Sequence, residues 1–296
     1  MTLAQSYEHA PSDQLIKMNR YVVIGNPIAH SQSPRIHARF AALTGQAMTY
    51  DRLLVPLDGF AAALAQLQQD GVQGCNVTVP FKFDAFAAAQ VTSARAQLAL
   101  AANTLKFEAG QVFADNTDGV GLVRDIEVNA GVPLAGRDVL LIGAGGAAAG
   151  VLAPLLLAKP RRLVVVNRSS DKAEALVSRH HAHPSLQQAL QHAELSTQAL
   201  ASPGGPFDVV INASASSLSG AAVPVPASVL KAGTLVYDMM YGPAAAPLLQ
   251  WARDHGGVGR DGLGMLVEQA AEAFLLWRGV RPPSVQVLQE MRTAPP

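Results

Sequence analysis

A lysine stands where it could transfer a proton, at the end of a short alternating stretch of the chain. The stretch reads Asn-Val-Thr-Val-Pro-Phe-Lys and ends at Lys82. Strand side chains repeat every two residues, so Asn76 and Thr78 should share one face. The apolar periodicity of residues 81–88 predicts a helix, whose N-terminus would disfavour the Lys82 ammonium. Lys82 is therefore either a proton donor or an ordinary solvated lysine.

An aspartate later in the chain could be the partner of this lysine. Asp118 lies in the stretch Asp-Asn-Thr-Asp-Gly at residues 115–119, just before a predicted helix. One interpretation is a helix N-cap, a position that aspartate favours. The other is that Asp118 faces Lys82 across a cleft, where its opposite charge would hold the ammonium protonated and oriented.

Other polar residues could bind a small oxygen-rich molecule. Ser33 precedes Pro34 and reads as an N-cap with proline at the first helical position. Ser31 and Ser33 would also share a face in an extended segment, and two hydroxyls could grip a carboxylate. Asn103 is either an amide donor or a turn residue. Gln269 falls on an apolar helical face, where an amide usually has a specific partner.

A glycine-rich loop follows the apolar stretch 139–142 and opens a predicted helix. Its residues are Gly143, Ala144, Gly145, Gly146, Ala147 and Ala148. Glycines allow the tight turn and the close backbone approach that a dinucleotide requires, and the helix N-terminus would meet its pyrophosphate. A second predicted strand at the expected distance favours a nucleotide site over a plain strand–helix turn.

The end of that second strand indicates which nucleotide would bind. An NAD site usually places an acidic residue there for the ribose hydroxyls. This chain has Asn167-Arg168-Ser169, with Lys172 four residues beyond Arg168. Arg168 could stack on adenine or bind a 2′-phosphate, and Lys172 would add a second positive charge. The pattern favours NADP, and the alternative is a surface Arg/Lys pair.

The composition predicts a folded enzyme and excludes several classes of partner. The 296 residues are 49% hydrophobic and 15% charged, which suits two domains with cores. The net charge is +0 without long charged runs, so nucleic acid and anionic membranes are poor partners. Residues 139–158 have the length of a membrane span, but their glycines and Pro154 favour a strand, a loop and a helix. The N-terminus lacks a secretory signal, so we expect a cytoplasmic protein.

Metal-binding patterns are weak in this sequence. The single cysteine, Cys75, excludes an intramolecular disulfide and a cysteine-rich metal site. None of the eight histidines has a convincing ligand spacing, and His180, His181 and His183 read as a solvated helix end. We expect no metal.

Strands and helices alternate along the chain, which predicts parallel sheets with helical crossovers. The first set has strands over 21–25, 49–55 and 74–79, a hairpin of 104–107 with 112–115, and helices over 34–43, 60–69 and 81–88. The second set has strands over 138–142, 163–166, 208–211, 234–238 and near 257–259. Helices are also predicted from 120 to about 131 and over 264–278, whereas residues 180–205 are harder to interpret.

Together these motifs resemble the shikimate dehydrogenase family, from Tyr21 to about Leu288. The matching stretches are residues 25–34, 76–82, 115–121, 143–147, 167–168, 237–241 and 261–266. Several motifs in order are far more specific than one glycine loop. The resemblance implies two α/β domains around a cleft. A substrate domain with a mainly parallel sheet would take residues 20–118 and 255–296, and a Rossmann-type NADP domain residues 119–254. Residues 1–19 would form a flexible extension.

The resemblance also implies a role for each matching residue. Lys82 and Asp118 would be the catalytic pair. The substrate carboxylate would meet Ser31, Ser33 and Tyr241, and the ring hydroxyls would meet Asn76, Thr78, Asn103 and Gln269. The adenosine 2′-phosphate would lie against Asn167, Arg168 and Lys172, and the nicotinamide half near Asn212, Met239 and Gly262.

The implied reaction is reversible reduction of 3-dehydroshikimate to shikimate with NADPH, in chorismate and aromatic amino acid biosynthesis. The alternatives are an NAD-preferring quinate/shikimate dehydrogenase and a catalytically silent NADP-binding regulator. Lys172 stands where the family often has arginine, which weakens the 2′-phosphate clamp because lysine lacks the bidentate fork. Besides the small-molecule substrate no partner is implied, and monomer and homodimer both stay open.

Overall fold

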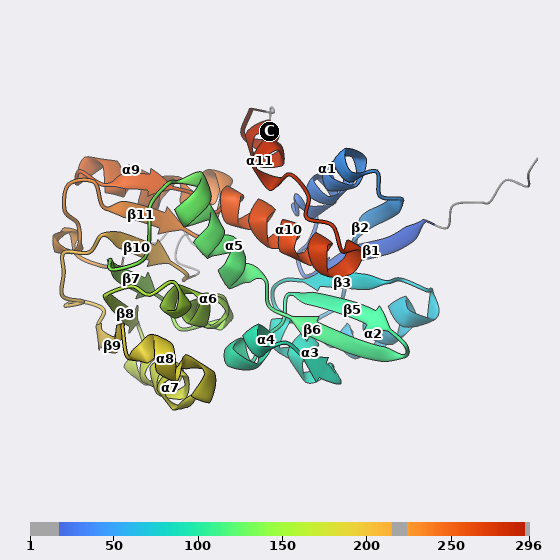
Figure 1. Ribbon diagram of the computed structural model, residues 1–296, viewed down its shortest axis with the longest axis horizontal. Helices are drawn as coiled ribbons and strands as arrows, with labels where there is room; N and C mark the ends of the chain where they lie inside the picture. The colour runs from blue at the N-terminus through green and yellow to red at the C-terminus, as the bar shows by residue number, and fades with distance from the viewer. Residues whose placement is uncertain (1–17, 215–223, 294–296) are drawn as a thin grey trace, which may run out of the picture.

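The computed structural model describes residues 18–214 and 224–293, which fold into two α/β lobes (Figure 1). Each lobe is built on a sheet of six strands. The expected N-terminal extension covers residues 1–19; its first 17 residues lie outside the described part, and Asn19 already belongs to the first strand. Two α/β domains were the sequence prediction, and this part of it is confirmed.

The sheet of the first lobe is mixed. Its strands are β1 (Asn19–Gly25), β2 (Met48–Leu54), β3 (Gly74–Val77), β4 (Val91–Thr92), β5 (Thr104–Glu108) and β6 (Gln111–Asp115), in the order β2-β1-β3-β5-β6-β4. The first three strands pair in parallel, whereas β5 runs antiparallel to both β3 and β6. The predicted hairpin is confirmed. Because β5 runs backward, its beginning meets the end of β3 at one edge.

Alternation along β1 explains why both faces of this sheet are covered. Tyr21 and Val23 pack into one hydrophobic cluster with helix residues of the C-terminal part, and Val22 and Ile24 pack into another. Successive strand residues point to opposite faces, so each set needs its own cover. The helices of this lobe are α1 (Ser33–Thr44), α2 (Phe60–Gln69), α3 (Lys82–Ala87) and α4 (Ala94–Ala99).

The sheet of the second lobe has only parallel pairings, which is the Rossmann-type arrangement expected. Its strands are β7 (Asp138–Ile142), β8 (Arg162–Asn167), β9 (Glu194–Ala199), β10 (Val209–Asn212), β11 (Leu235–Asp238) and β12 (Val258–Arg260), in the order β12-β11-β10-β7-β8-β9. Its helical segments are α6 (Gly146–Leu157), α7 (Ser170–Ala182), η2 (Pro184–Leu186), α8 (Gln187–Leu190), η4 (Ala227–Val229), η5 (Gly242–Ala245) and α9 (Ala246–Asp254). None of the described helices is long and apolar enough to cross a membrane.

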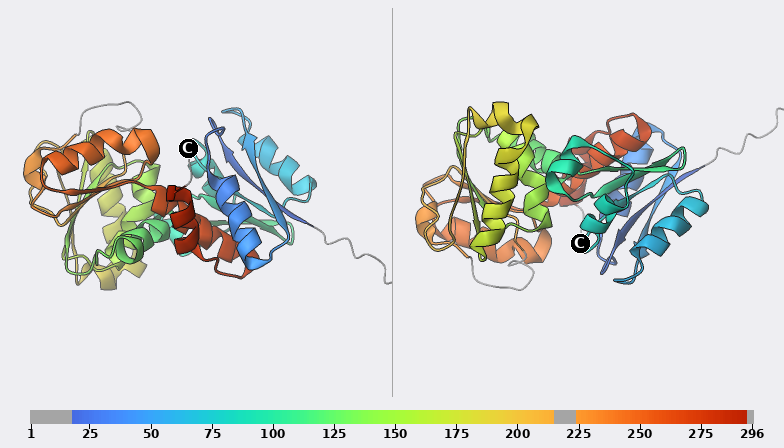
Figure 2. Two further views of the ribbon diagram at one scale, coloured as in Figure 1. Left: turned by 90° about the horizontal axis from the view of Figure 1, so that it is seen from above. Right: turned by 90° about the horizontal axis from the view of Figure 1, so that it is seen from below.

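Two crossing helices lie between the lobes (Figure 2). They are α5 (Asp118–Arg124), continued by the π-helical turn η1 (Asp125–Asn129), and α10 (Leu263–Arg278), which α11 (Ser284–Thr293) follows. The helices approach closely at Gly121, where an added Cβ would lie 2.7 Å from the backbone nitrogen of Gln269. Arg124 and Glu268 join them by an ion pair of 2.9 Å. The chain therefore passes between the lobes through a tightly packed helix pair.

Some sequence expectations differ from the structure. The boundary expected at residue 255 assigns β12 to the first lobe, but β12 pairs with β11 in the second sheet. His180 was expected to be solvated and is instead fully buried, with Nδ1 2.9 Å from the carbonyl oxygen of Leu176. The segment 180–205 contains the strand β9, whose sequence Glu-Leu-Ser-Thr-Gln-Ala is mostly polar because β9 is an edge strand.

Candidate active site

Several of the predicted substrate residues lie along one edge of the first sheet. The parallel strands β1 and β3 both end there, with Ile24 opposite Val77. Because β5 is antiparallel, its first residue Thr104 lies opposite both Asn76 and Asp115, the last residue of β6. The loops that carry the serines, the lysine and the aspartate therefore leave the sheet at a common edge.

The lysine and the aspartate form a direct ion pair. Lys82 Nζ donates to Asp118 Oδ2 at 2.6 Å, and both side chains are largely shielded from solvent, with 18% and 8% exposed. Lys82 is the first residue of α3, which places it at a helix N-terminus as predicted, although the helix begins one residue later than expected. Asp118 is the first residue of α5, whose N-cap is Thr117, so the N-cap interpretation of Asp118 is wrong. The carboxylate instead holds the ammonium in place.

Asn103 connects this pair to the helix that crosses between the lobes. Its Nδ2 donates to Asp118 Oδ1 at 2.8 Å and to Gln269 Oε1 at 3.2 Å. Its Oδ1 accepts from the Thr117 amide at 2.8 Å. Gln269 in turn donates to the carbonyl of Leu266 at 2.9 Å, and its Oε1 also accepts from Thr117 Oγ1 at 3.3 Å. The amide expected to have a specific partner therefore has three. The carboxylate of Asp118 is thus fixed from two sides.

Asn76 is buried and hydrogen-bonded at the same edge. Its Nδ2 donates to the carbonyl of Asn103 at 3.1 Å and to Thr104 Oγ1 at 3.0 Å. Its Oδ1 accepts from the Tyr50 hydroxyl at 2.6 Å. Thr78 is half-buried two residues on, with its methyl group against Gly25. Sequence reasoning missed Tyr50, because a tyrosine is an ordinary residue in a strand.

Ser31 and Ser33 lie in the loop between β1 and α1. The Ser33 amide donates to Ser31 Oγ at 3.3 Å. The expected N-cap role of Ser33 is wrong, because Ser33 is the first helical residue and the N-cap is Gln32 without a side-chain cap bond. Arg52, at the end of β2, donates from Nε and Nη2 to the Ser31 carbonyl at 3.0 and 2.6 Å. This arginine was also missed.

Tyr241 reaches this loop from the second lobe. Its phenol lies beside the backbone of Gln32. Burial raises the pKa of Tyr241, and the Gln32 backbone and the positive charge of Arg52 oppose that rise. The phenol therefore stays protonated at neutral pH and can donate a hydrogen bond. The structure therefore brings Tyr241 close to the serine loop.

The glycine loop occupies the carboxyl edge of the second sheet. It follows β7 directly, and Gly145 is the N-cap of α6. Gly143 adopts φ 119°, which favours glycine, and its amide donates to the carbonyl of Val166 at 2.7 Å. A Cβ on Gly145 would meet nothing within 4 Å, so the loop backbone is open to a ligand. An open backbone at a helix N-terminus fits a dinucleotide pyrophosphate.

The remaining cofactor candidates follow the neighbouring strands. Asn167 ends β8, where its Nδ2 donates to the Ser169 carbonyl at 2.9 Å, and Arg168 and Lys172 are exposed next to it. Asn212 ends β10 and accepts from Ser214 Oγ at 2.7 Å. Met239 follows β11, and a Cβ on Gly262 would lie 2.3 Å from the Met239 carbonyl oxygen, so only glycine fits there. These residues share one edge, where ligands of open parallel sheets bind.

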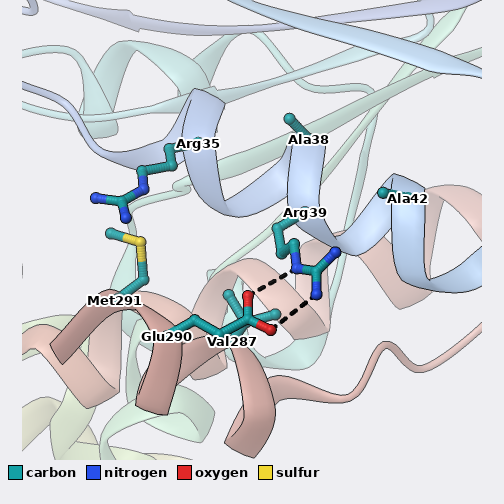
Figure 3. Close-up of a pocket in the computed structure, with 7 residues that line it drawn as sticks. All are labelled: Arg35, Ala38, Arg39, Ala42, Val287, Glu290 and Met291. Carbon is teal, nitrogen blue, oxygen red and sulfur yellow. Dashed lines mark hydrogen bonds and ion pairs between the residues drawn. The ribbon is translucent and has the colours of Figure 1, made fainter. Parts of the chain in front are cut away.

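No metal site competes with this interpretation in the described part of the chain. Residues 18–214 and 224–293 contain no group of three or more His, Cys, Asp or Glu side chains that could hold a metal ion. A surface groove lies elsewhere, between α1 and α11, with a volume of about 400 Å³ (Figure 3). Arg39 and Glu290 form a bidentate ion pair in that groove at 2.7 and 2.8 Å.

The amino-acid sequence matches three known domain families. Residues 23–105 match the shikimate dehydrogenase substrate binding domain, residues 127–219 match shikimate / quinate 5-dehydrogenase, and residues 262–292 match the shikimate 5'-dehydrogenase C-terminal domain. The shikimate dehydrogenase (NADP(+)) of Acidovorax sp. strain JS42 is 65% identical over 93% of this chain and 96% of its own length. That of Dechloromonas aromatica strain RCB is 52% identical over 92% and 97%.

Solved structures agree with these matches. An Ael1 enzyme from Pseudomonas putida superposes with a TM-score of 0.83 and 47% identity, covering 94% of this chain and 99% of that one. Shikimate 5-dehydrogenase from Thermus thermophilus, solved with NADP(H) and shikimate, gives a TM-score of 0.80 and 29% identity over 93% and 99%. With its domain matches, its high identity to curated relatives and its two-lobed fold, this chain belongs to the shikimate dehydrogenase family.

Proposed function

We propose that this chain catalyses the reversible reduction of 3-dehydroshikimate to shikimate with NADPH. The observation that carries the proposal is the ion pair of 2.6 Å between Lys82 Nζ and Asp118 Oδ2. It lies where the substrate-binding edge of the first lobe faces the glycine loop of the second. The high identity to relatives named shikimate dehydrogenase (NADP(+)) supports the same reaction.

Lys82 supplies the proton in this proposal. As the ring ketone of the substrate is reduced, its oxygen gains negative charge, and the Lys82 ammonium donates a proton to that oxygen. Asp118 keeps the ammonium aimed at the substrate, and Asn103 keeps the carboxylate aligned. In the reverse direction the neutral amine accepts the proton of the shikimate hydroxyl.

The rest of the first edge binds the substrate. We assign the carboxylate to Ser31, Ser33 and Tyr241, which together form a cluster of hydroxyl groups. The ring hydroxyls fall to the polar groups around the ion pair, namely Asn76, Thr78, Asn103 and Gln269. Mutual hydrogen bonds hold Asn76, Asn103 and Gln269 in place before a substrate arrives, which lowers the entropic cost of binding.

The second edge binds the cofactor, and NADPH would supply the hydride when bound. We assign the pyrophosphate to the backbone of Gly143, Ala144, Gly145, Gly146 and Ala147. Arg168, Lys172 and Asn167 hold the 2′-phosphate, with Arg168 as the main charge because its guanidinium can bind two oxygens at once. Asn212, Met239 and Gly262 line the nicotinamide half.

An assay of hydride transfer tests the function. The purified chain should reduce NADP⁺ in the presence of shikimate, followed by absorbance of NADPH. Lys82→Ala should lower kcat by about two to four orders of magnitude, the usual contribution of a proton-transfer group. Substrate affinity should change much less.

A second lysine provides the control for this variant. Lys106 pairs with Glu108 at 2.8 Å in the hairpin of the first lobe, so Lys106→Ala removes a charge without touching the site. It should keep normal turnover. A Lys82→Ala enzyme as active as the Lys106→Ala enzyme would contradict the catalytic role.

The domain division, assembly and location complete the proposal. We infer that the first lobe with α10 and α11 acts as the substrate domain, and that the second sheet, including β12, acts as the NADP domain. We also infer a cytoplasmic protein that works as a monomer or homodimer. Size-exclusion chromatography with light scattering would decide between the two states.

A further inference from the structure

The proposed carboxylate site consists of neutral groups. Ser31, Ser33 and Tyr241 offer hydroxyls, and the burial that raises the pKa of Tyr241 keeps its phenol uncharged. A substrate carboxylate carries a full negative charge, and hydrogen bonds between ionised partners are stronger than those between neutral ones. A nearby positive charge would therefore add both affinity and selectivity.

Arg52 brings such a charge to the site. Its guanidinium is anchored on the carbonyl oxygen of Ser31 by two hydrogen bonds of 3.0 and 2.6 Å. The same guanidinium acts electrostatically on the phenol of Tyr241, from the opposite lobe. Arg52 thus lies close to two of the three hydroxyl residues.

The charge of Arg52 is not neutralised by an acidic residue in the described structure. Arg52 takes part in none of the ion pairs formed within residues 18–214 and 224–293. Its side chain is exposed, and two of its five guanidinium N–H groups serve the Ser31 carbonyl. The remaining donors and the full positive charge stay available to an anion.

The strand β2 explains the placement of Arg52. Tyr50 and Arg52 are two residues apart in β2, so both side chains leave the same face of the sheet. Tyr50 reaches Asn76 with its hydroxyl, and Arg52 reaches the serine loop. One strand face therefore serves two neighbouring parts of the proposed substrate site.

We propose that Arg52 recognises the substrate carboxylate by its charge and makes the site select an anionic substrate over its neutral analogue. The inference rests on the proposed function, which assigns the carboxylate to Ser31 and Ser33. Arg52 acts in binding and not in proton transfer, so its contribution is equal in the ground state and the transition state. Its loss should raise KM and leave kcat nearly unchanged.

The test compares two substrates and two substitutions. Arg52→Gln should raise the KM for shikimate about three- to tenfold, the range of a partly solvated charge interaction. The KM of the unaltered enzyme should rise with salt, and that of Arg52→Gln should rise less. For the methyl ester of shikimate, both enzymes should have the same KM. Arg52→Lys keeps the charge and should stay within about threefold of the unaltered enzyme for shikimate.

Arg35 provides the control for a general loss of charge. It lies in the first turn of α1, two residues after Ser33, and is exposed. Its side chain points into the groove against α11, beside Met291 (Figure 3). Arg35→Gln should therefore leave the KM for shikimate unchanged.

Two results would overturn the inference. One is an unchanged KM for shikimate in Arg52→Gln. The other is an equal rise in KM for Arg52→Lys and Arg52→Gln with both shikimate and its methyl ester. That pattern would mean that Arg52 only supports the Ser31 loop. An unaltered enzyme that fails to turn over shikimate would instead defeat the proposed function, and calorimetric titration with shikimate would still measure the Arg52 contribution to binding.

Discussion

At the scale of single residues, the Tyr50 hydroxyl supports the side chains of the proposed substrate site, although it is not one of the reacting groups. It donates to Asn76 Oδ1 at 2.6 Å and also interacts with the Ser33 side chain. Tyr50 therefore links a residue of the proposed carboxylate site to a residue of the proposed hydroxyl site. Burial raises the pKa of Tyr50 well above its ordinary value, so the hydroxyl remains a donor.

Tyr50→Phe should weaken substrate binding. The substitution leaves the buried Asn76 oxygen without its donor, so the amide loses its fixed orientation. We expect a roughly tenfold higher KM for shikimate, equivalent to about 1.4 kcal/mol, with a smaller change in kcat. Tyr21→Phe is the control, because Tyr21 is also buried but stacks on Trp277. If Tyr50→Phe and Tyr21→Phe had the same KM for shikimate, Tyr50 would have no role in substrate binding.

Arg168→Ala should change the KM for NADPH much more than the KM for NADH. Arg168 is exposed at the end of β8, where a 2′-phosphate would lie. Losing a charge-assisted hydrogen bond should raise the KM for NADPH about ten- to a hundredfold. The KM for NADH, which lacks that phosphate, should stay nearly constant and serves as the internal control. An equal loss for both cofactors would contradict the 2′-phosphate assignment.

Sequence alone could predict the residues that carry unusual chemistry for their position. Lys82 stood out because a cation was expected at a helix N-terminus, and Asp118 because it preceded the next predicted helix and could face that cation. The structure pairs them. Tyr50 and Arg52 did not stand out, because a tyrosine and an arginine are ordinary strand residues. Their roles depend on the packing of β2 against the loop after β1, which is a long-range contact. Local patterns contain no signal for such a contact.

At the scale of elements, most strand and helix boundaries were predicted to within two residues. β7 and α2 begin and end where expected, because an apolar run and a helical period each mark them clearly. The helix after Asp118 was expected to be continuous, yet it changes to a π-helical turn at Asp125. Asp125 is buried and accepts from Tyr237 at 2.7 Å and from Arg260 at 2.8 and 2.6 Å. Partners from distant strands set this turn, so the local sequence does not reveal it.

Helix α1 shows how one element serves both the site and the core. Ser33 and His37 are one turn apart, so they lie on the same buried side of α1. His37 is fully buried and stacks on Tyr50 at 4.1 Å, and neither ring nitrogen has a hydrogen-bond partner among the described residues. Burial lowers the pKa of His37 to about 3, and the neighbouring Asn76 opposes this shift.

This histidine should make the fold sensitive to acid. Below its ordinary pKa of 6.5 the unfolded chain binds a proton that the folded chain refuses until about pH 3. Stability should therefore fall as pH drops through this window. At pH 4 the loss from His37 alone should be about 3 kcal/mol.

Unfolding by urea at pH 7 and pH 4 would measure this effect. His37→Phe keeps an aromatic ring in the stack and should show a smaller loss between the two pH values. Phe40→Leu loosens the same core without removing a titratable group, so it should lower stability equally at both. If His37→Phe lost as much stability between pH 7 and pH 4 as the unaltered protein, the acid sensitivity would come from other groups.

At the scale of the whole molecule, the two lobes touch on both sides of the site. Tyr241 of the second lobe reaches Gln32 of the first. Phe83, the residue after Lys82, reaches in the other direction, because a Cβ on Gly146 would lie 3.4 Å from its Cζ atom. The two-domain organisation followed from the chain length and the family resemblance, and the parallel sheets followed from the alternation of strands and helices. These contacts did not, because they depend on the angle at which α5 and α10 cross.

Phe83 should affect cofactor binding although it belongs to the substrate lobe. This residue is 55% exposed, and its ring lies against the loop proposed to hold the pyrophosphate. The Phe83 ring would cover a cofactor bound on that loop, and the cofactor would shield the ring from water. Phe83→Ala should therefore raise the Kd for NADPH about three- to tenfold, because a partly buried apolar contact is lost. The KM for shikimate should change less than twofold.

Fluorescence titration with NADPH alone would measure this effect without turnover. Leu157→Ala is the matched control, because Leu157 is 53% exposed on α6 but lies at the opposite end of that helix from the glycine loop. Phe83→Leu should fall between the unaltered enzyme and Phe83→Ala, since it keeps apolar volume but loses the flat ring. If Phe83→Ala binds NADPH as tightly as Leu157→Ala does, the contact with Gly146 contributes nothing to the cofactor site, and the lobes act there independently.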